Sequence, residues 1–227
     1  MKRLSASLSE PAVRRVVVSS LTLSGAVGVF ALSFGVASVS AGASVMQTCA
    51  LSLFVFTGAS QFSAMSVVGA GGSMAAAFGG AALLAARNFV YGLALSSSAK
   101  SMANSLPRRL FASHFVIDET TALALAQESP RLRKIAFWTT GIGLFSFWNI
   151  GTLIGALAGN TIDPQKFGLD IAFPAAFIVM LLPHLRTKLG RQAAILGAAL
   201  CLVSISFTPI GIPILIAATA VLVGLRK

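Results

Sequence analysis

A single arginine lies in the middle of a long apolar stretch of this chain, residues 72–97. At a rise of about 1.5 Å per residue, a helix formed by that stretch is long enough to cross the hydrocarbon core of a bilayer. A guanidinium group at that depth costs about 2.5–3.5 kcal/mol on insertion scales. Arg87 and its neighbour Asn88 are therefore expected to face protein, a water-filled cavity or a ligand instead of lipid.

The composition indicates that the whole chain is a membrane protein. Hydrophobic residues make up 56% and charged residues 10% of the 227 residues, and the mean hydropathy is +0.87. Soluble domains carry about 25% charged residues. We therefore expect an all-α, polytopic helical bundle in the plasma (inner) membrane. Residues 16–227 would form a single transmembrane domain, and residues 1–15 a basic segment on the membrane surface.

The basic residues give the chain a net charge of +11 and fall in short clusters between the apolar stretches. The clusters are Lys2, Arg3, Arg14 and Arg15; Lys100, Arg108 and Arg109; Arg131, Arg133 and Lys134; Arg186, Lys188 and Arg191; and Arg226 and Lys227. Such clusters are typical of membrane-flanking loops that contact anionic lipids. They do not indicate a nucleic-acid partner.

Several kinds of chemical site are not expected. Cys49 and Cys201 lie inside apolar stretches, which favours packing residues over a disulfide or a metal pair. His114 and His184 lack metal-ligand spacing. The sequence holds no HExxH, GxSxG or GxxxxGK[ST] motif, so we expect no enzyme, no cofactor and no ATP hydrolysis by this chain itself.

The second expected membrane span, residues 45–68, contains three polar side chains and a glycine within five positions. These residues are Thr57, Gly58, Ser60 and Gln61. Either the side chains form hydrogen bonds with neighbouring helices, or the helix is broken and its freed backbone groups line a cavity. In the second case, the segment would bind the charged end of a small ligand. Phe54, Phe56, Phe62, Phe173 and Phe177 would either line an apolar pocket nearby or be ordinary membrane-span residues.

The number of spans depends on residues 110–126, a moderately apolar stretch that carries Asp118 and Glu119. This stretch is either an amphipathic interfacial helix or a weak span. The chain then has seven or eight spans. We expect about seven, with six to eight as the range, and the sidedness of the termini stays open.

An internal repeat is one further feature that the sequence allows. Residues 72–79 align without gaps with residues 190–197. This alignment favours either two three-span repeats, about residues 25–97 and 137–225 with residues 98–136 as an amphipathic linker, or a chance match of apolar segments. The broken helices would lie at Gly58 and Pro174, and such breaks mark the binding site in many secondary transporters.

Three carboxylates could take part in transport. A proton-coupled carrier needs a carboxyl group that loads and releases a proton, which suits Asp118, Glu119 or Asp170. The alternatives are a solvated helix cap for the first two and an N-terminal acid of a short helix for Asp170. Arg87 would meet a substrate carboxylate, hold one of these carboxylates in its charged form, or form a structural ion pair with one.

Four stretches resemble the AzlC/YgaZ family of branched-chain amino acid permeases, which are large subunits of two-component exporters. They are residues 56–62 (FTGASQF), 86–92 (ARNFVYG), 118–120 (DET) and 168–177 (GLDIAFPAAF), and residues 148–152 (WNIGT) fit as well. The resemblance extends from about Gly25 to the C-terminus. In the family pattern an asparagine often precedes the arginine and a histidine follows it. Here Asn88 follows Arg87, which puts the polar detail of this position in doubt.

The resemblance implies export of hydrophobic L-amino acids such as valine, leucine or isoleucine, together with a small AzlD/YgaH-like membrane subunit. Coupling to the proton gradient through alternating access is the expected mechanism. The expected substrate-binding or coupling residues are Thr57, Gly58, Ser60, Gln61, Arg87, Asn88, Asp118, Glu119, Trp148, Asp170, Phe173 and Pro174. Two alternatives stay open: an exporter or channel for a different small solute, and a non-transporting scaffold subunit.

Overall fold

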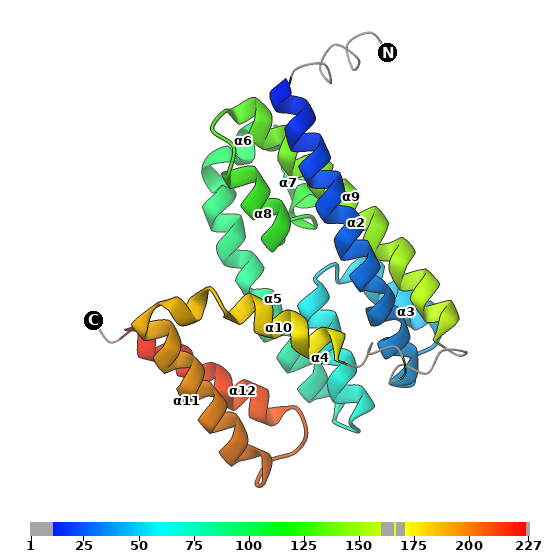
Figure 1. Cartoon of the computed structure of the whole chain (residues 1–227), viewed down its shortest axis with the longest axis vertical. Helices are drawn as coiled ribbons and strands as arrows, with labels where there is room; N and C mark the ends of the chain where they lie inside the picture. Colours follow the sequence, from blue (N-terminus) through cyan, green and yellow to red (C-terminus); the bar gives the residue numbers. More distant parts are fainter. Residues whose placement is uncertain (1–10, 160–165, 167–170, 226–227) are drawn as a thin grey trace.

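The computed structural model describes residues 11–159, 166 and 171–225, and every regular element within them is a helix (Figure 1). The α-helices are α2 (Pro11–Ser40), α3 (Val45–Phe54), α4 (Gly58–Gly69), α5 (Met74–Leu95), α6 (Ala99–Met102), α7 (Leu106–Ser113), α8 (Asp118–Leu125), α9 (Pro130–Ala158), α10 (Ala172–Leu181), α11 (Lys188–Ile205) and α12 (Ile212–Ala218). Three 3-10 helices, η1 (Ser96–Ser98), η2 (His184–Arg186) and η3 (Thr219–Leu225), complete the described elements. The all-α membrane bundle is thereby confirmed.

Four of the described helices are long and apolar enough to cross a membrane. They are Pro11–Ser40, Met74–Ser98, Pro130–Ala158 and Lys188–Ile205. Helix Met74–Ser98 agrees with the stretch of residues 72–97 that the sequence predicts to cross the bilayer. Shorter apolar helices include Val45–Phe54 and Ile212–Gly224. Cys49 and Cys201 are both free and half-buried, in agreement with a packing role.

Helices α2 and α9 lie side by side over most of their length and form the frame of the bundle (Figure 1). Neither Gly35 of α2 nor Gly155 of α9 has room for a Cβ atom, because backbone of the other helix occupies that space. Small residues at a helix interface allow this close approach. Further along, Thr140 Oγ1 donates a hydrogen bond to Ser20 Oγ at 2.8 Å.

Helices α3 and α4 form a first hairpin whose two ends lie at the same end of the bundle (cyan in Figure 1). At its start, the hydroxyl groups of Thr48 and Ser38 share a hydrogen bond of 2.8 Å next to the end of α2. At its end, a Cβ atom on Gly69 would lie 2.9 Å from Cβ of Ala41, which directly follows α2. The hairpin therefore enters and leaves the bundle where α2 ends.

The tip of this first hairpin, residues 55–57, lies at mid-height of the bundle. The ring of Phe56 packs against Phe145 of α9 with centroids 5.2 Å apart. The break that the sequence allowed between residues 55 and 58 is confirmed. The prediction of a second span over residues 45–68 is wrong, because the chain reverses at the break instead of continuing across the bundle.

Helices α7 and α8 form a second hairpin that enters from the opposite end. Arg133, in the first turn of α9, donates hydrogen bonds to Ser98 Oγ at 2.7 Å and to Gln127 O at 3.0 Å. These bonds place the ends of α5 and α8 beside the start of α9. The tip, residues 114–117, reaches the first hairpin, and the rings of His114 and Phe56 lie 5.7 Å apart. Residues 110–126 thus form parts of two short helices with a turn between them and not a single membrane-crossing helix. The alternative of an amphipathic interfacial helix stays a prediction.

The last helices close the bundle on the side of α4 and α5. A Cβ atom on Gly211, between α11 and α12, would lie 2.9 Å from Cβ of Ala76 in α5. The predicted repeats over residues 25–97 and 137–225 stay a prediction, because most of residues 160–170 lie outside the described part of the chain.

Many basic residues gather at the end of the bundle where α2 and α9 begin. Arg15 of α2 lines a small cavity together with Gln127 and Leu132. The basic residues of this end are Arg14, Arg15, Arg108, Arg109, Arg131, Arg133 and Lys134. The opposite end, formed by the α2–α3 and α4–α5 turns, carries no Lys or Arg within residues 41–44 and 70–73.

Candidate functional site

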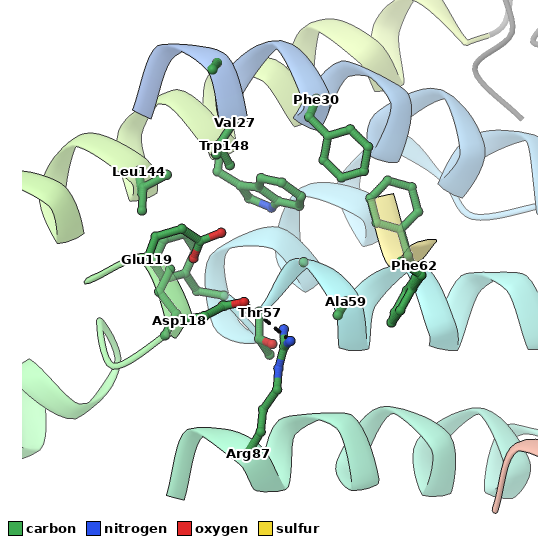
Figure 2. A pocket seen from close by; sticks show the side chains of 15 residues that line it. Val27, Phe30, Thr57, Ala59, Phe62, Arg87, Asp118, Glu119, Leu144 and Trp148 are labelled. Atoms are coloured by element: carbon green, nitrogen blue, oxygen red, sulfur yellow. Dashed lines mark ion pairs between the residues drawn. The ribbon is translucent and has the colours of Figure 1, made fainter. Parts of the chain in front are cut away.

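The tips of the two hairpins border a cavity of about 300 Å³ in the middle of the bundle (Figure 2). It is lined by Ala26, Val27 and Phe30 of α2; Phe56, Thr57, Gly58, Ala59 and Phe62 of the first hairpin; Arg87 of α5; Ile117, Asp118 and Glu119 of the second hairpin; Leu144 and Trp148 of α9; and Phe177 of α10. A cavity of this volume lies at the lower end of the range for small-molecule sites. Six of the twelve predicted site residues line it: Thr57, Gly58, Arg87, Asp118, Glu119 and Trp148.

The first tip presents the N-terminus of α4 to this cavity. Thr57 occupies the N-cap position, and its side chain does not cap the helix but lies 3.4 Å from Ser60 Oγ. The first N–H groups of a helix have no intrahelical acceptor and carry the positive end of the helix dipole. Gly58 lies against Trp148, since a Cβ atom there would be 2.8 Å from Cη2 of the indole ring. This side of the cavity is therefore uncharged but electropositive.

Gln61 holds the first tip in place from behind the cavity wall. Its Nε2 donates to Leu51 O at 2.9 Å, and its Oε1 accepts from Trp148 Nε1 at 3.0 Å. The amide thus connects α3, α4 and α9. Gln61 and Ser60 are fully buried and do not line the cavity. Both interpretations of this segment apply, since the helix is broken and its polar side chains form hydrogen bonds.

An ion pair between Arg87 and Asp118 connects α5 to the second hairpin. Nη1 of the arginine lies 3.4 Å from Oδ2 of the aspartate, and the two side chains are 24% and 30% exposed (dashed line in Figure 2). The predicted interaction of Arg87 with a carboxylate is thereby present. The Nε atom of Arg87 is buried without a hydrogen-bond partner among the described residues. The guanidinium group therefore has donors left for a further acceptor.

Glu119 lies in the same first turn of α8 but points elsewhere in the cavity. Figure 2 shows its carboxylate on the side of Leu144 and Trp148, away from Arg87. Among the described residues, the structure shows no ion pair for this carboxylate. Both acids lie at the N-terminus of α8, where the helix dipole favours negative charge.

Thr120 stabilises the second tip and was not among the predicted site residues. It is fully buried, its hydroxyl group lies 2.6 Å from Phe115 O, and it accepts from Ile117 N at 3.1 Å. A signal for this role was present in the sequence. Threonine at the third position of a helix can bond to the N-cap backbone, as in a capping box.

The remaining wall of the cavity is aromatic and aliphatic. Phe30 packs against Phe62 with ring centroids 5.2 Å apart, and against Trp148 at 6.3 Å. Of the five phenylalanines considered from the sequence, Phe56, Phe62 and Phe177 line the cavity. The contribution of α2 was missed, because no polar residue or break in that span distinguished the cavity-facing side.

Two further predicted residues, Asn88 and Pro174, do not line this cavity. Asn88 lines a separate outer groove with His114 and Phe89. Pro174 is exposed in the first turn of α10. Asp170 and the side chain of Phe173 lie outside the described residues. Within the part of the chain that the structure describes, no group of three His, Cys, Asp or Glu residues could hold a metal ion.

Comparison with known proteins agrees with the resemblance found in the sequence. The family described as AzlC protein matches residues 22–162, which include every cavity-lining residue except Phe177. An archaeal relative from Archaeoglobus fulgidus, named "Uncharacterized membrane protein", is 30% identical over 91% of this chain and 92% of its own length. The "Inner membrane protein YgaZ" of Escherichia coli is 29% identical over 74% of this chain and 72% of its own length.

A further relative from Helicobacter pylori, also named "Uncharacterized membrane protein", is 26% identical over 77% of this chain and 76% of its own length. No solved structure matches the chain. The family and these membrane-protein relatives support a role in membrane transport. The family match covers more than half of the sequence, and the chain therefore belongs to the AzlC family.

Proposed function

We propose that this protein exports branched-chain or similar hydrophobic L-amino acids across the plasma (inner) membrane, driven by the proton gradient. The observation that carries the proposal is the mixed character of the cavity between the hairpin tips. One part offers a helix N-terminus and charged side chains, and the other part is aromatic and aliphatic. An apolar amino acid has the same division into a charged end and an apolar end.

The substrate carboxylate fits the first tip and Arg87. The N-terminus of α4 at Gly58 favours an anion, as discontinuous helices do in other transporters. The donors of Arg87 that Asp118 does not use would bind the same carboxylate. The apolar side chain would then pack against Phe30, Phe62 and Trp148, where a polar side chain would lose its hydrogen bonds to water.

The two hairpins supply the moving parts that alternating access needs. They enter from opposite ends and meet at the cavity, while α2 and α9 form a closely packed frame behind them. Movement of either hairpin relative to this frame would open the cavity toward one side. Small shifts of packed elements between two arrangements are a common basis of such transitions.

The basic end of the bundle supports a cytoplasmic N-terminus. Lys and Arg accumulate in the cytoplasmic loops of membrane proteins, and the basic residues at the start of α2, α7 and α9 share one end. These residues would also contact anionic lipids. The sequence resemblance adds a small AzlD/YgaH-like membrane subunit as the partner needed for activity.

The test is amino acid efflux from cells preloaded with labelled valine, leucine, methionine and, as a charged control, lysine. The cells express this chain together with the neighbouring small subunit, with and without a protonophore. We expect faster efflux of the three apolar amino acids, unchanged efflux of lysine, and loss of the difference with the protonophore. Arg14→Ala, an exposed substitution at the basic end, is the matched control for Arg87→Ala.

Three results would contradict parts of this proposal. No gain for any amino acid, with both subunits present in the membrane, would exclude amino acids as the cargo. Efflux that persists with the protonophore would favour a channel-like exporter. Normal efflux in Arg87→Ala would show that this residue serves assembly only, as in a scaffold subunit.

A further inference from the structure

The cavity holds an unequal number of charges. Among the described residues that line it, Arg87 contributes one positive charge, and Asp118 and Glu119 contribute two carboxyl groups. Arg87 is paired with Asp118. An ionised Glu119 would leave one negative charge without a partner in a site bounded largely by apolar side chains. Such a charge is costly unless a proton or another cation neutralises it.

Few other ionisable groups face Glu119. Arg87 and Tyr91 of α5 are close enough to interact with it electrostatically, as is Asp118 on its own helix. The facing stretches of α2 (residues 26–30) and α9 (residues 144–148) contain no ionisable side chain. No histidine or lysine is among the described residues that line the cavity, so we expect a proton or a bound ligand to supply the positive charge that would neutralise Glu119.

We propose that Glu119 binds either a proton or the ammonium group of the substrate, but not both, and thereby exchanges one proton for one amino acid. This inference rests on the proposed function, and it assigns different tasks to the two adjacent acids. Asp118 stays paired with Arg87. Glu119, directed toward Leu144 and Trp148, accepts the cation.

The positions of the groups are compatible with a bound zwitterion. The ammonium and carboxylate groups of an amino acid are attached to the same carbon atom, so their partners must lie in one small cavity. Here Glu119 and the N-terminus of α4 both line the same cavity of about 300 Å³. The indole ring of Trp148, beside Glu119 in Figure 2, would add a favourable cation–π contact with the ammonium group.

Because Glu119 binds either a proton or the ammonium group, the proton and the amino acid are expected to move in opposite directions. In the loaded state Glu119 is ionised and pairs with the ammonium group, and in the empty state it carries a proton. Substrate binding therefore releases one proton to the solution, and protonation releases the substrate. At pH values where empty Glu119 is protonated, leucine affinity falls about tenfold for each unit of pH decrease. Proton entry then drives amino acid exit.

The experiment measures proton release when leucine binds to the purified protein with its small subunit in weakly buffered detergent solution. A pH indicator reports the protons, and binding is measured in parallel over a range of pH values. We expect about one proton per bound leucine. Glu119→Gln should abolish both the proton release and the pH dependence of leucine affinity. Glu128→Gln, an exposed acid just beyond α8, should change neither and is the matched control.

Each alternative result has a definite meaning. Leucine binding without proton release in the unmodified protein overturns the inference and leaves the proposed function intact. Proton release that persists in Glu119→Gln but disappears in Asp118→Asn also overturns it, because Asp118 would then be the proton site. Failure of the unmodified protein to bind any apolar amino acid contradicts the proposed function itself, and with it the inference.

Discussion

The two hairpins enter the bundle from opposite ends, yet each presents the N-terminus of its second helix to the same cavity. Helix α4 begins at Gly58 and helix α8 begins at Asp118. The first tip lines the cavity with neutral groups, and the second adds two carboxyl groups. Equivalent backbone geometry thus supports opposite electrostatic environments.

The tips also differ in how they are held. Gln61 fastens the first tip to Trp148 of the α2–α9 frame, whereas Thr120 bonds only to the backbone of its own loop. The second hairpin is connected to α5 through the pair of Arg87 and Asp118. The first tip is thus connected to the frame by a hydrogen bond, whereas the second is connected to α5 by an ion pair.

Removing the ion pair should have the largest effect. Arg87→Ala leaves Asp118 without its cation. Loss of one partner of a fully buried pair costs about 3–5 kcal/mol, so we expect a smaller loss of stability for this partly exposed pair. We expect efflux at background and a lower unfolding temperature. Adding Asp118→Ala should restore much of the stability, measured by thermal unfolding in detergent, but no efflux. Recovery of efflux in the double variant would show that the pair has only a structural role.

Adding a side chain at Gly58 in the first tip should have the next largest effect. Gly58→Val would direct its side chain into Trp148 and displace the N-terminus of α4. Because displacements of about 1 Å in a functional site can cost about 100-fold, we expect efflux to fall by about 100-fold. Gly25→Val is the control, since no atom lies within 4 Å of a Cβ atom there. Equal efflux of both variants would place the substrate elsewhere.

Substitutions of Thr120 and Gln61, the two residues that hold the tips in place, should have different effects. Thr120→Val removes the hydroxyl group that accepts from Ile117 N–H and lies against Phe115 O, and Gln61→Leu leaves Trp148 N–H unpaired. A lost hydrogen bond costs about 0.5–1.5 kcal/mol and a buried group left unpaired costs about 1–3 kcal/mol, so both variants should unfold at lower temperature. Only Gln61→Leu should also change the ratio of leucine to valine efflux, because it frees the indole ring. Unchanged ratios in both variants would contradict the assignment of Trp148 to the substrate side chain.

Asn88→Ala should have the smallest effect. The residue follows Arg87 in sequence but lines the outer groove instead of the cavity. We expect less than about a twofold change in efflux, since Asn88 does not line the cavity between the hairpin tips. A loss of efflux comparable with that of Arg87→Ala would show that Asn88 belongs to the substrate site.

Much of the site could be predicted from polarity alone. Thr57, Gly58, Arg87 and the adjacent acids are conspicuous in apolar surroundings, because polar groups at that depth need partners. Their spacing in the sequence did not show which of them share a cavity. Two consecutive helical residues point about 100° apart, which is why Arg87 and Asn88 lie in different cavities.

The hairpins could not be predicted from hydropathy. A continuous apolar stretch of the length of residues 45–68 is compatible with a span or with two half-helices that reverse at a break. The direction of the chain after Thr57 is set by tertiary contacts, such as those of Gly69 with Ala41 and of Gln61 with Trp148. Residues 110–126 gave a weak signal for the same reason, since neither half of that hairpin is long enough to span.

The most direct test of the site is substrate protection of a cysteine placed in the cavity. Cys49 and Cys201 are replaced by serine, Ala59 of the cavity wall is replaced by cysteine, and labelling by a small methanethiosulfonate reagent is measured with and without amino acids. Ala70→Cys, in the exposed α4–α5 turn, is the control. We predict that leucine and valine slow the labelling of position 59, that lysine does not, and that position 70 is labelled equally in all cases. Labelling of position 59 that no amino acid changes, in a protein that still exports leucine, would contradict a substrate site between the two hairpin tips.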